Sequence, residues 1–291
     1  MSTSRLTALL AALCLAPTLA LAQTSSAALD GRLKKIQSSK TITVAYRTDA
    51  VPFSYENGDK KPTGYTVELC QRVIGVIEKQ IGVSPLQVKW VPVTVQNRFS
   101  TVASGQADME CGASSVTLSR MKEVDFSSLV FVDGTGVLLR SSTQGFSLSA
   151  LANKKIGVIS GTSNEKALAD ALKAKVVTAT LVPVKSREDG LAQLEAGTIE
   201  GLAGDRVLLV GLASKSKDPK SLALLADALS YEPYAIALPR GDWALRLAVN
   251  SALSQIYSSA ALPELYGKWF AGLGNPSPVL EVMYALGRLP E

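Results

Sequence analysis

Short β-rich runs alternate with helical patterns along this chain, and the alternation occurs in two regions. The run TITVAYR at 41–47 precedes a segment with apolar residues at helical spacing over 65–81, and KKIGVIS at 154–160 precedes a second helical pattern over 161–175. Such alternation predicts βα units, with mostly parallel sheets flanked by helices. The chain has 291 residues, more than one compact core usually takes, so we expect two α/β lobes.

The two regions also share a local pattern, in which a helix ends at glycine, an acid follows and a strand runs into small residues. Three pairs of positions stand 92 residues apart: Gly105 with Gly197, Asp108 with Glu200, and Ala113 with Asp205. This constant spacing predicts that each lobe presents the end of an equivalent strand to a common cleft. Ligands of open α/β sheets bind at the carboxyl ends of strands.

The first 22 residues have the pattern of a secretory signal peptide. Arg5 precedes an apolar run, and Ala20-Leu21-Ala22 forms a small-x-small cleavage pattern. A membrane anchor is the alternative, but the run is short and Pro17 interrupts it. We therefore expect cleavage after Ala22 and a mature protein that is soluble outside the cytoplasm.

Composition excludes several kinds of chemistry. The chain has no histidine, which excludes a Ser-His-Asp triad, a Cys-His dyad and any His-ligated metal site. Its net charge of +5 is dispersed without a long Lys/Arg block, so nucleic acid is not an expected partner. We expect neither a metal nor a cofactor.

Two cysteines remain once the signal peptide is removed, Cys70 and Cys111. In an oxidising compartment such a pair favours a disulfide, and two buried free thiols are the alternative. Cys70 lies on the apolar face of a predicted helix and Cys111 ends a neighbouring strand, so the two can approach closely. We predict a Cys70–Cys111 disulfide.

Polar residues that suit an amino-acid ligand stand where predicted strands end. Arg120 follows the small and hydroxyl residues of GASS, and its guanidinium suits a carboxylate. Thr162 stands where a strand gives way to a helix, a position that favours an anion. Asp205 ends a strand and suits an ammonium group, although an acid there can also cap the next helix. One cationic centre, one anionic centre and several hydroxyls predict a pocket for a zwitterion, of which an α-amino acid is the obvious example.

Several segments together resemble a known family. They are YRTDAVPFSYENGDKKPTGYTVELC, VPVTVQNR, DMECGASS with Arg120 after it, SGTSNE, LEAGTIEGLAGDRVLL and YGKWF. They are similar to the amino-acid-binding solute receptors of bacterial ABC importers, in particular the glutamate/aspartate-binding branch. The resemblance covers nearly the whole mature chain. It implies the two-lobe, type II periplasmic binding protein fold, a periplasmic monomer without enzymatic activity, and transient binding to an inner-membrane permease.

The resemblance also implies roles at the α-carbon end of a bound amino acid. Arg120, Ser115 and Thr162 would hold the α-carboxylate. Asp205, with the carbonyl of Ala113, would hold the α-ammonium. Ala113 stands where the family has serine, which removes one hydroxyl from the ligand's surroundings.

At the side-chain end, the resemblance implies that Arg47 and Arg98 face the second carboxylate of glutamate or aspartate. Val95 stands where receptors for acidic ligands usually have serine, which weakens the acidic-ligand interpretation. Arg187 falls where a histidine often contributes, and it strengthens that interpretation if it points inward.

The resemblance also suggests where the chain is divided. By analogy with hinge-closing periplasmic binding proteins, we expect one lobe from 28–136 plus 235–291 and the other from 140–230. The hinge crossings would be 136–140 and 229–235.

A periplasmic dehydratase-like enzyme on the same fold, acting on a cyclic carboxylic acid, is the alternative function. It would need a general acid near its substrate, and Glu68, Glu110 or Glu165 could be proposed. No pair of carboxylates stands out in the sequence, so the receptor interpretation is the main hypothesis.

Overall fold

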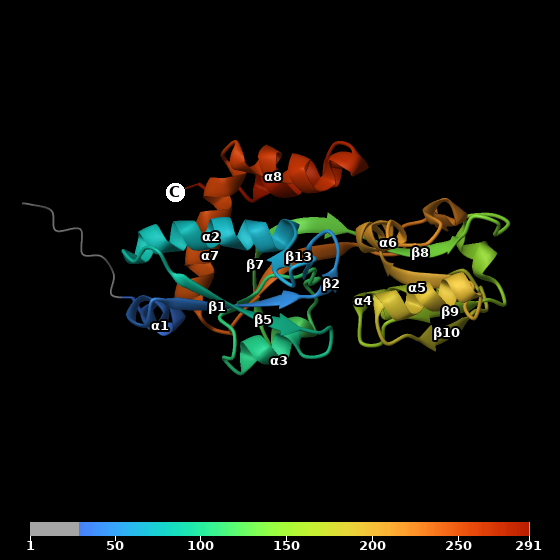
Figure 1. Ribbon diagram of the computed structural model, residues 1–291, viewed down its shortest axis with the longest axis horizontal. Coiled ribbons are helices and arrows are strands. Elements are labelled where there is room, and N and C mark those ends of the chain that lie inside the picture. Colours follow the sequence, from blue (N-terminus) through green and yellow to red (C-terminus); the bar gives the residue numbers. More distant parts are fainter. Residues whose placement is uncertain (1–28, 291) are drawn as a thin grey trace, which may run out of the picture.

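The computed structural model describes residues 29–290 and shows two lobes, each built on one five-stranded sheet with helices packed against it (Figure 1). The predicted two-lobe α/β architecture is confirmed. The predicted signal peptide at 1–22 lies outside the described residues. None of the described helices is long and apolar enough to cross a membrane.

The first lobe contains the sheet with strand order β5-β1-β6-β13-β7. Strands β5, β1 and β6 pair in parallel, whereas β13 runs antiparallel to both of its neighbours. The strands of this sheet are β1 (Thr41–Arg47), β5 (Gln87–Val93), β6 (Met109–Glu110), β7 (Asp125–Asp133) and β13 (Glu232–Leu238).

The second lobe repeats this arrangement with the order β10-β9-β11-β8-β12. Strands β10, β9 and β11 are parallel, and β8 runs antiparallel to both of its neighbours. The prediction of mostly parallel sheets is therefore correct except for one strand in each sheet. The strands are β8 (Thr135–Arg140), β9 (Lys155–Val158), β10 (Thr180–Pro183), β11 (Gly201–Asp205) and β12 (Leu222–Leu224).

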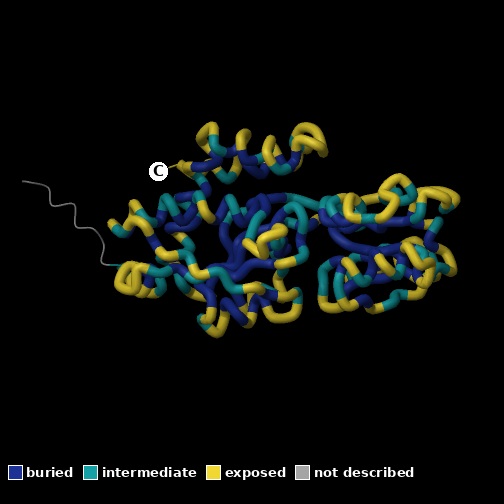
Figure 2. The backbone as a smooth tube through the Cα atoms, in the orientation of Figure 1, coloured by how far each residue is buried: buried dark blue, intermediate teal, exposed yellow. Residues whose placement is uncertain are grey.

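Helices lie against both sheets, and the buried strands lie inside them (Figure 2). Helix α2 packs in this way because its apolar residues, which recur at helical spacing, are buried on one face. Gly82, with a φ of +66°, ends the helix. The helices of the first lobe are α1 (Gly31–Ser39), α2 (Tyr65–Ile81), α3 (Arg98–Ala103), α7 (Trp243–Tyr257), α8 (Ala261–Phe270) and α9 (Pro278–Leu286). Those of the second lobe are α4 (Ser163–Ala174), α5 (Arg187–Ala196) and α6 (Arg206–Ala213).

The local pattern shared by the two lobes has a structural basis. Gly105 and Gly197 both adopt positive φ, at +81° and +75°. The carboxylate of Asp108 accepts from the backbone N–H of Thr43 at 2.8 Å, and that of Glu200 accepts from Lys155 at 2.7 Å. Equivalent acids thus attach β6 and β11 to the adjacent parallel strand in each lobe.

The chain changes sheets twice. It leaves the first sheet at the end of β7 and enters the second at Thr135, with Gly134 between them. It returns between the end of β12 at Leu224 and the start of β13 at Glu232. The assignment of 136–140 and 229–235 as hinges concerns motion and stays a prediction.

Two local features bear on the site. A disulfide joins Cys70 of α2 to Cys111 directly after β6, which confirms the predicted pairing and attaches this strand end to a helix. The segment in which the sequence showed only turn signals forms a small antiparallel sheet of β2 (Asp49–Ala50), β3 (Ser54–Glu56) and β4 (Pro62–Thr63). Strands this short show too little alternation to be recognised from sequence.

Candidate ligand-binding site

A cavity of about 770 Å³ lies between the lobes. Its lining includes residues 117–120 of the first lobe, 161–163 of the second, and Ser230 and Glu232 at the return crossing. Two predicted site residues, Arg120 and Thr162, are part of this lining. The structure therefore brings the predicted carboxylate-binding groups of both lobes to one cleft.

Arg120 begins the short 3₁₀ helix η1 (Arg120–Lys122) at the edge of the cleft. Its Nη1 donates to the carbonyl of Ser115 at 2.7 Å, and Ser115 forms a β-bridge with Tyr234 of β13. Burial lowers the pKa of the Arg120 guanidinium, against the effect of the carboxylates of Glu232 and Asp205. These contacts hold the guanidinium between the strand ends and leave its other N–H groups for a ligand.

Thr162 is the N-cap of α4, as its place between a strand and a helix indicates. Its Oγ1 accepts from the backbone N–H of Glu165 at 3.2 Å and donates to the carbonyl of Ile159 at 2.7 Å. The threonine side chain is therefore used to begin the helix. The N-terminal end of α4, where partial positive charge accumulates, remains directed at the cleft.

Arg47 and Arg98 are not among the residues that line this cavity; both are buried, with exposed fractions of 2% and 4%. Within the described residues, Nε and Nη1 of Arg47 and Nε of Arg98 have no hydrogen-bond partner. Burial lowers the pKa of Arg98 to about 9, a shift that Arg47 and Arg120 reinforce and Glu110 opposes. Buried donors of this kind call for an acceptor.

Glu110, at the end of β6, lies beside these arginines and is fully buried. Neither carboxylate oxygen has a hydrogen-bond partner among the described residues. Burial raises the pKa of this carboxyl, although the charges of Arg98 and Arg47 oppose the shift. A Cβ on Gly112 would lie 2.0 Å from Glu110 Oε1, so a larger residue here would displace the Glu110 carboxylate.

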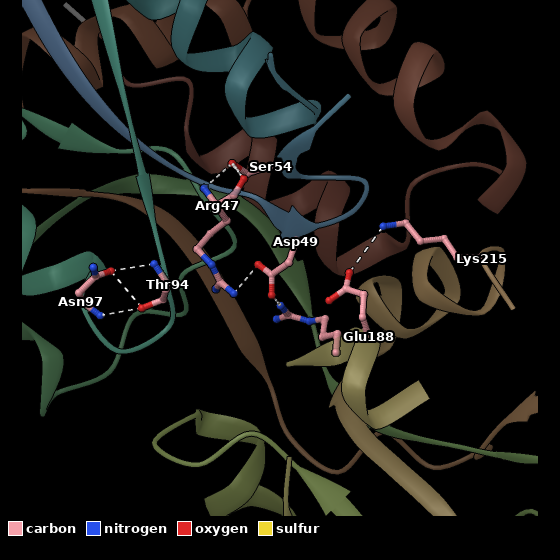
Figure 3. Close-up of polar contacts among 8 residues, drawn as sticks. Arg47, Asp49, Ser54, Thr94, Asn97, Glu188 and Lys215 are labelled. Atoms are coloured by element: carbon pink, nitrogen blue, oxygen red, sulfur yellow. Dashed lines mark hydrogen bonds and ion pairs between the residues drawn. The ribbon is translucent and has the colours of Figure 1, made fainter. Parts of the chain in front are cut away.

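Arg187 points toward the first lobe, which answers the question that the sequence left open. Its Nη1 lies 2.9 Å from Oδ2 of Asp49, and Oδ1 of the same carboxylate pairs with Nη2 of Arg47. Figure 3 shows Arg47 and Asp49 facing each other beside the small sheet. Sequence reasoning missed Asp49, and its signal was an acid two residues after Arg47 in YRTDAVPF.

Acidic side chains gather at the opposite end of the site. Asp205 ends β11, and its Oδ1 accepts from Asn164 Nδ2 at 3.3 Å. Its side chain does not cap α6, because the carboxylate of Asp133 accepts from Val207 N at that helix end instead. Burial and the neighbouring charge of Glu232 raise the pKa of Asp205. The Asp205 carboxylate is therefore available to an ammonium group, and a bound cation would relieve the crowding of negative charge.

Glu232 is a second acid at this end that the sequence did not reveal. Its carboxylate accepts from the hydroxyls of Thr135, Ser163 and Ser230 at 3.2, 2.7 and 2.7 Å.

Ala113 is buried on the segment that follows β6, with 6% of its surface exposed. Among residues 29–290, no group of three His, Cys, Asp or Glu side chains could hold a metal ion.

The sheet orders and the cleft between the lobes define the class of protein, a two-lobe binding protein of the type II periplasmic fold. Solved structures share this fold, among them a cysteine-binding protein from Campylobacter jejuni (TM-score 0.71, 20% identity, 83% of this chain and 93% of that one). Another is an ancestral amino acid-binding protein described as a precursor of cyclohexadienyl dehydratase (TM-score 0.70, 24% identity, 82% of this chain and all of that one). At these identities the likeness shows the fold alone.

The chain belongs to the bacterial extracellular solute-binding proteins, family 3, whose model matches residues 42–272. It is 31% identical to the L-glutamate/L-aspartate-binding protein of Pseudomonas aeruginosa, over 91% of this chain and 86% of that protein. It is 30% identical to the glutamate/aspartate import solute-binding protein of Escherichia coli K12, over 92% of this chain and 87% of that protein. The family resemblance that the sequence motifs indicated is confirmed.

Proposed function

We propose that this protein binds an α-amino acid with an acidic side chain, glutamate or aspartate, in the cleft between its lobes and delivers it to an ABC importer. The observation that carries this proposal is the pair of buried guanidinium groups of Arg47 and Arg98, in which Nε and Nη1 of Arg47 and Nε of Arg98 have no hydrogen-bond partner among the described residues. A buried cation without an anion is strongly disfavoured, and a ligand carboxylate is an anion of suitable charge. The names of the Pseudomonas and Escherichia relatives support the same ligand class.

The α-carbon end of the ligand would lie at the mouth of the cleft. Arg120, the backbone of Ser115 and the N-terminal end of α4 at Thr162 would receive the α-carboxylate. The α-ammonium would face Asp205 and the carbonyl of Ala113. This assignment uses one cationic and one anionic group from different lobes, so ligand binding would favour closure of the cleft.

The side-chain carboxylate of the ligand would point toward Arg98 and Arg47. Arg187 belongs to the same end of the site, but its Nη1 is already paired with Asp49. Charge-assisted hydrogen bonds from a guanidinium to a carboxylate are among the stronger hydrogen bonds in proteins. An amide in this position would leave Arg98 without a ligand carboxylate to pair with.

The positions of the three candidate acids favour binding without turnover over a dehydratase activity. Of the three acids considered for general-acid chemistry, Glu68 accepts from Lys268 and Trp269 on the surface of the first lobe. Glu165 accepts from the backbone N–H of Gly161 at the start of α4. Glu110 is buried beside the arginines. We therefore propose that the protein is not an enzyme, and incubation with a prephenate-like acid should give no product.

We further propose that residues 1–22 direct export to the periplasm, and that the mature monomer contacts an inner-membrane permease transiently. Loss of export on deletion of residues 1–22 would support the first statement, and retention of the full-length chain in the cytoplasm would contradict it. Cross-linking to the permease in membranes containing the importer tests the second statement.

A thermal-shift screen of the mature protein against the common amino acids, followed by calorimetric titration, tests the ligand assignment. A ligand that binds only the folded state raises the apparent melting temperature. Glutamate and aspartate should give the largest shifts. A preference for glutamine or an aliphatic amino acid would overturn the acidic-ligand assignment, and no shift with any amino acid would overturn the receptor function itself.

A further inference from the structure

Asp49 is an acid inside a site that is otherwise arranged to receive one. It lies in β2 of the first lobe, and its carboxylate pairs with Arg47 of the same lobe and with Arg187 of the second lobe. The side chain retains 19% exposure, so the carboxylate lies at the boundary between the lobes. Arg47 and Arg187 are the groups that would otherwise turn toward an anionic ligand.

The carboxylate of Asp49 is ionised at neutral pH. Burial raises the pKa of Asp49, but the charges of Arg187 and Arg47 outweigh burial and leave the pKa below its ordinary value. The cationic end of the site thus contains three arginines, Arg47, Arg98 and Arg187, and one carboxylate that is ion-paired with two of them. Glu110, the other acid at this end, makes no hydrogen bond within the described residues.

The ion pair with Asp49 changes what a ligand carboxylate can gain. One N–H group of Arg47 and one of Arg187 are directed at Asp49, and the two remaining buried donors of Arg47 and the donors of Arg98 are left for the ligand. A pocket discriminates an acid from its amide by the cation that the amide leaves unpaired. An anion supplied by the protein lessens that penalty, because it neutralises part of the positive charge whichever ligand is bound.

We propose that Asp49 is a specificity-determining residue that reduces the preference of this pocket for acidic amino acids over their amides. This inference rests on the proposed amino-acid ligand and adds the residue that sets the degree of discrimination. Removing the charge of Asp49 frees Arg187 and Arg47 to meet a ligand carboxylate. Acidic ligands then gain affinity relative to glutamine and asparagine.

A purely mechanical role for this contact makes a different prediction. The lobes also touch beside Asp49, where a side chain on Gly211 of α6 would lie 2.6 Å from the carbonyl oxygen of Val51. If the Asp49–Arg187 pair only held the lobes together, its loss would lower the affinity for every ligand by the same factor. The ratio of amide to acid affinities therefore separates the two roles.

The test is calorimetric titration of wild type and Asp49→Asn with glutamate, glutamine, aspartate and asparagine. We expect the ratio of the dissociation constants, amide over acid, to rise at least about tenfold in Asp49→Asn. Asp49→Ser, which is smaller and also uncharged, should raise the ratio in the same direction. Arg187→Met should not raise the ratio, because it removes one positive charge from this end of the site and leaves the Asp49 carboxylate in place, paired with Arg47 alone.

Glu188→Gln is the matched control, since it makes the same change from acid to amide one residue after Arg187. Glu188 pairs only loosely with Lys215, at 3.7 Å, and both side chains are about half exposed (Figure 3). The ratio of amide to acid dissociation constants in Glu188→Gln should equal that of wild type. A ratio in Asp49→Asn and Asp49→Ser that is unchanged or lower, or equal weakening of all four ligands, overturns the role of Asp49. Failure of wild type to bind any of the four overturns the proposed function and this inference together.

Discussion

The arginine end of the site holds six of the seven buried side-chain N and O atoms that lack a hydrogen-bond partner among residues 29–290, whereas the acidic end holds none. These six atoms belong to Arg47, Arg98, Glu110 and Ser114, whose side chain lies beside that of Glu110. At the acidic end, three hydroxyls donate to Glu232 and Asn164 donates to Asp205. Native proteins leave few buried polar groups unpaired, so the concentration at one end is informative.

This difference indicates which end of the site has buried polar groups that stay unpaired until a ligand binds. Unpaired buried groups lower the stability of the folded protein, and a ligand that pairs with them recovers this loss as affinity. The acidic end is satisfied by the protein itself, and its remaining problem is repulsion between like charges. We therefore expect changes at the arginine end to alter selectivity between acidic and amide ligands. Changes to Asp133 and to the hydroxyls around Glu232 should mainly alter stability and its dependence on pH.

The largest effect is expected from Arg98→Met, which keeps much of the side-chain volume and removes the charge. Truncating one partner of a buried charge pair costs about 2–5 kcal/mol, so affinity for glutamate or aspartate should fall by roughly 30-fold or more. Glutamine should lose far less, because it does not offer the second carboxylate. Calorimetric titration of both proteins with the three ligands gives the comparison.

Arg246→Met is the control for this change, because Arg246 lies over the ring of the exposed Trp243 and is not among the residues that line the cleft. Its affinities should match those of wild type. Equal weakening of all three ligands by Arg98→Met would show that Arg98 supports the fold or the α-carboxylate site, and the functional contrast between the two ends would fail.

The sequence predicts the arginines of this site but not Asp49. The arginines could be chosen because Arg47, Arg98 and Arg120 lie in segments that resemble the family. Asp49 could not, because an acid in a turn-rich segment is by default a surface residue. Its partner Arg187 is 138 positions away, and only the docking of the two lobes brings the two together.

The same limit applies to the fold. The alternation of strands and helices predicts two α/β lobes, and the apolar spacing over 65–81 predicts α2 at Tyr65–Ile81. The antiparallel placement of β8 and β13 is a long-range property, because each strand enters its sheet from the other lobe. Local periodicity carries no information about which neighbours a strand will pair with.

The second prediction concerns Asp133 and the pH dependence of stability at the acidic end. Burial, together with the charge of Asp205, raises the pKa of Asp133 from 3.8 to about 7, while the nearby Arg206 opposes the shift. In this window the folded protein binds a proton that the unfolded chain does not. The contribution to stability is therefore fully present below pH 4 and is lost as the pH rises toward 7.

One pKa unit corresponds to about 1.4 kcal/mol, so this loss can reach about 4 kcal/mol. Asp133→Asn should reduce the slope, because the amide keeps an oxygen for the N–H of Val207 and does not titrate; Asp205 and Glu110, whose pKa values are also raised, account for the slope that remains. Urea unfolding of both proteins between pH 4 and pH 7 measures the slopes. Equal slopes would show that Asp133 is already ionised throughout and that repulsion does not limit the acidic end.

The third prediction tests whether closure of the lobes contributes equally to the affinity for acidic and for amide ligands. In Gly211→Ala the added Cβ meets the carbonyl oxygen of Val51, a backbone atom of the other lobe, at 2.6 Å. Overpacking of this kind costs about 1–3 kcal/mol, so affinity for acidic and amide ligands should fall by a common factor of about ten. Small-angle scattering should show a larger radius of gyration with ligand present.

Gly75→Ala is the matched control, because Gly75 lies inside α2 and a Cβ there meets nothing within 4 Å. It should leave affinity unchanged and raise stability slightly, as the change from glycine to alanine does in a helix. If Gly211→Ala weakens glutamate but not glutamine, closure acts on the arginine end alone, and the two ends are not coupled through the lobes.

The smallest effect is expected from Ser163→Ala at the acidic end. The Ser163 hydroxyl donates to Oε2 of Glu232, while Thr135 and Ser230 donate to Oε1. Loss of one hydrogen bond among several should lower the free energy of unfolding by about 0.5–1.5 kcal/mol and leave ligand selectivity unchanged. Ser100→Ala, at an exposed position in α3, should change stability by less than about 0.5 kcal/mol. If Ser163→Ala changes the free energy of selectivity by more than it changes the free energy of unfolding, Glu232 acts on the ligand directly, in addition to Asp205.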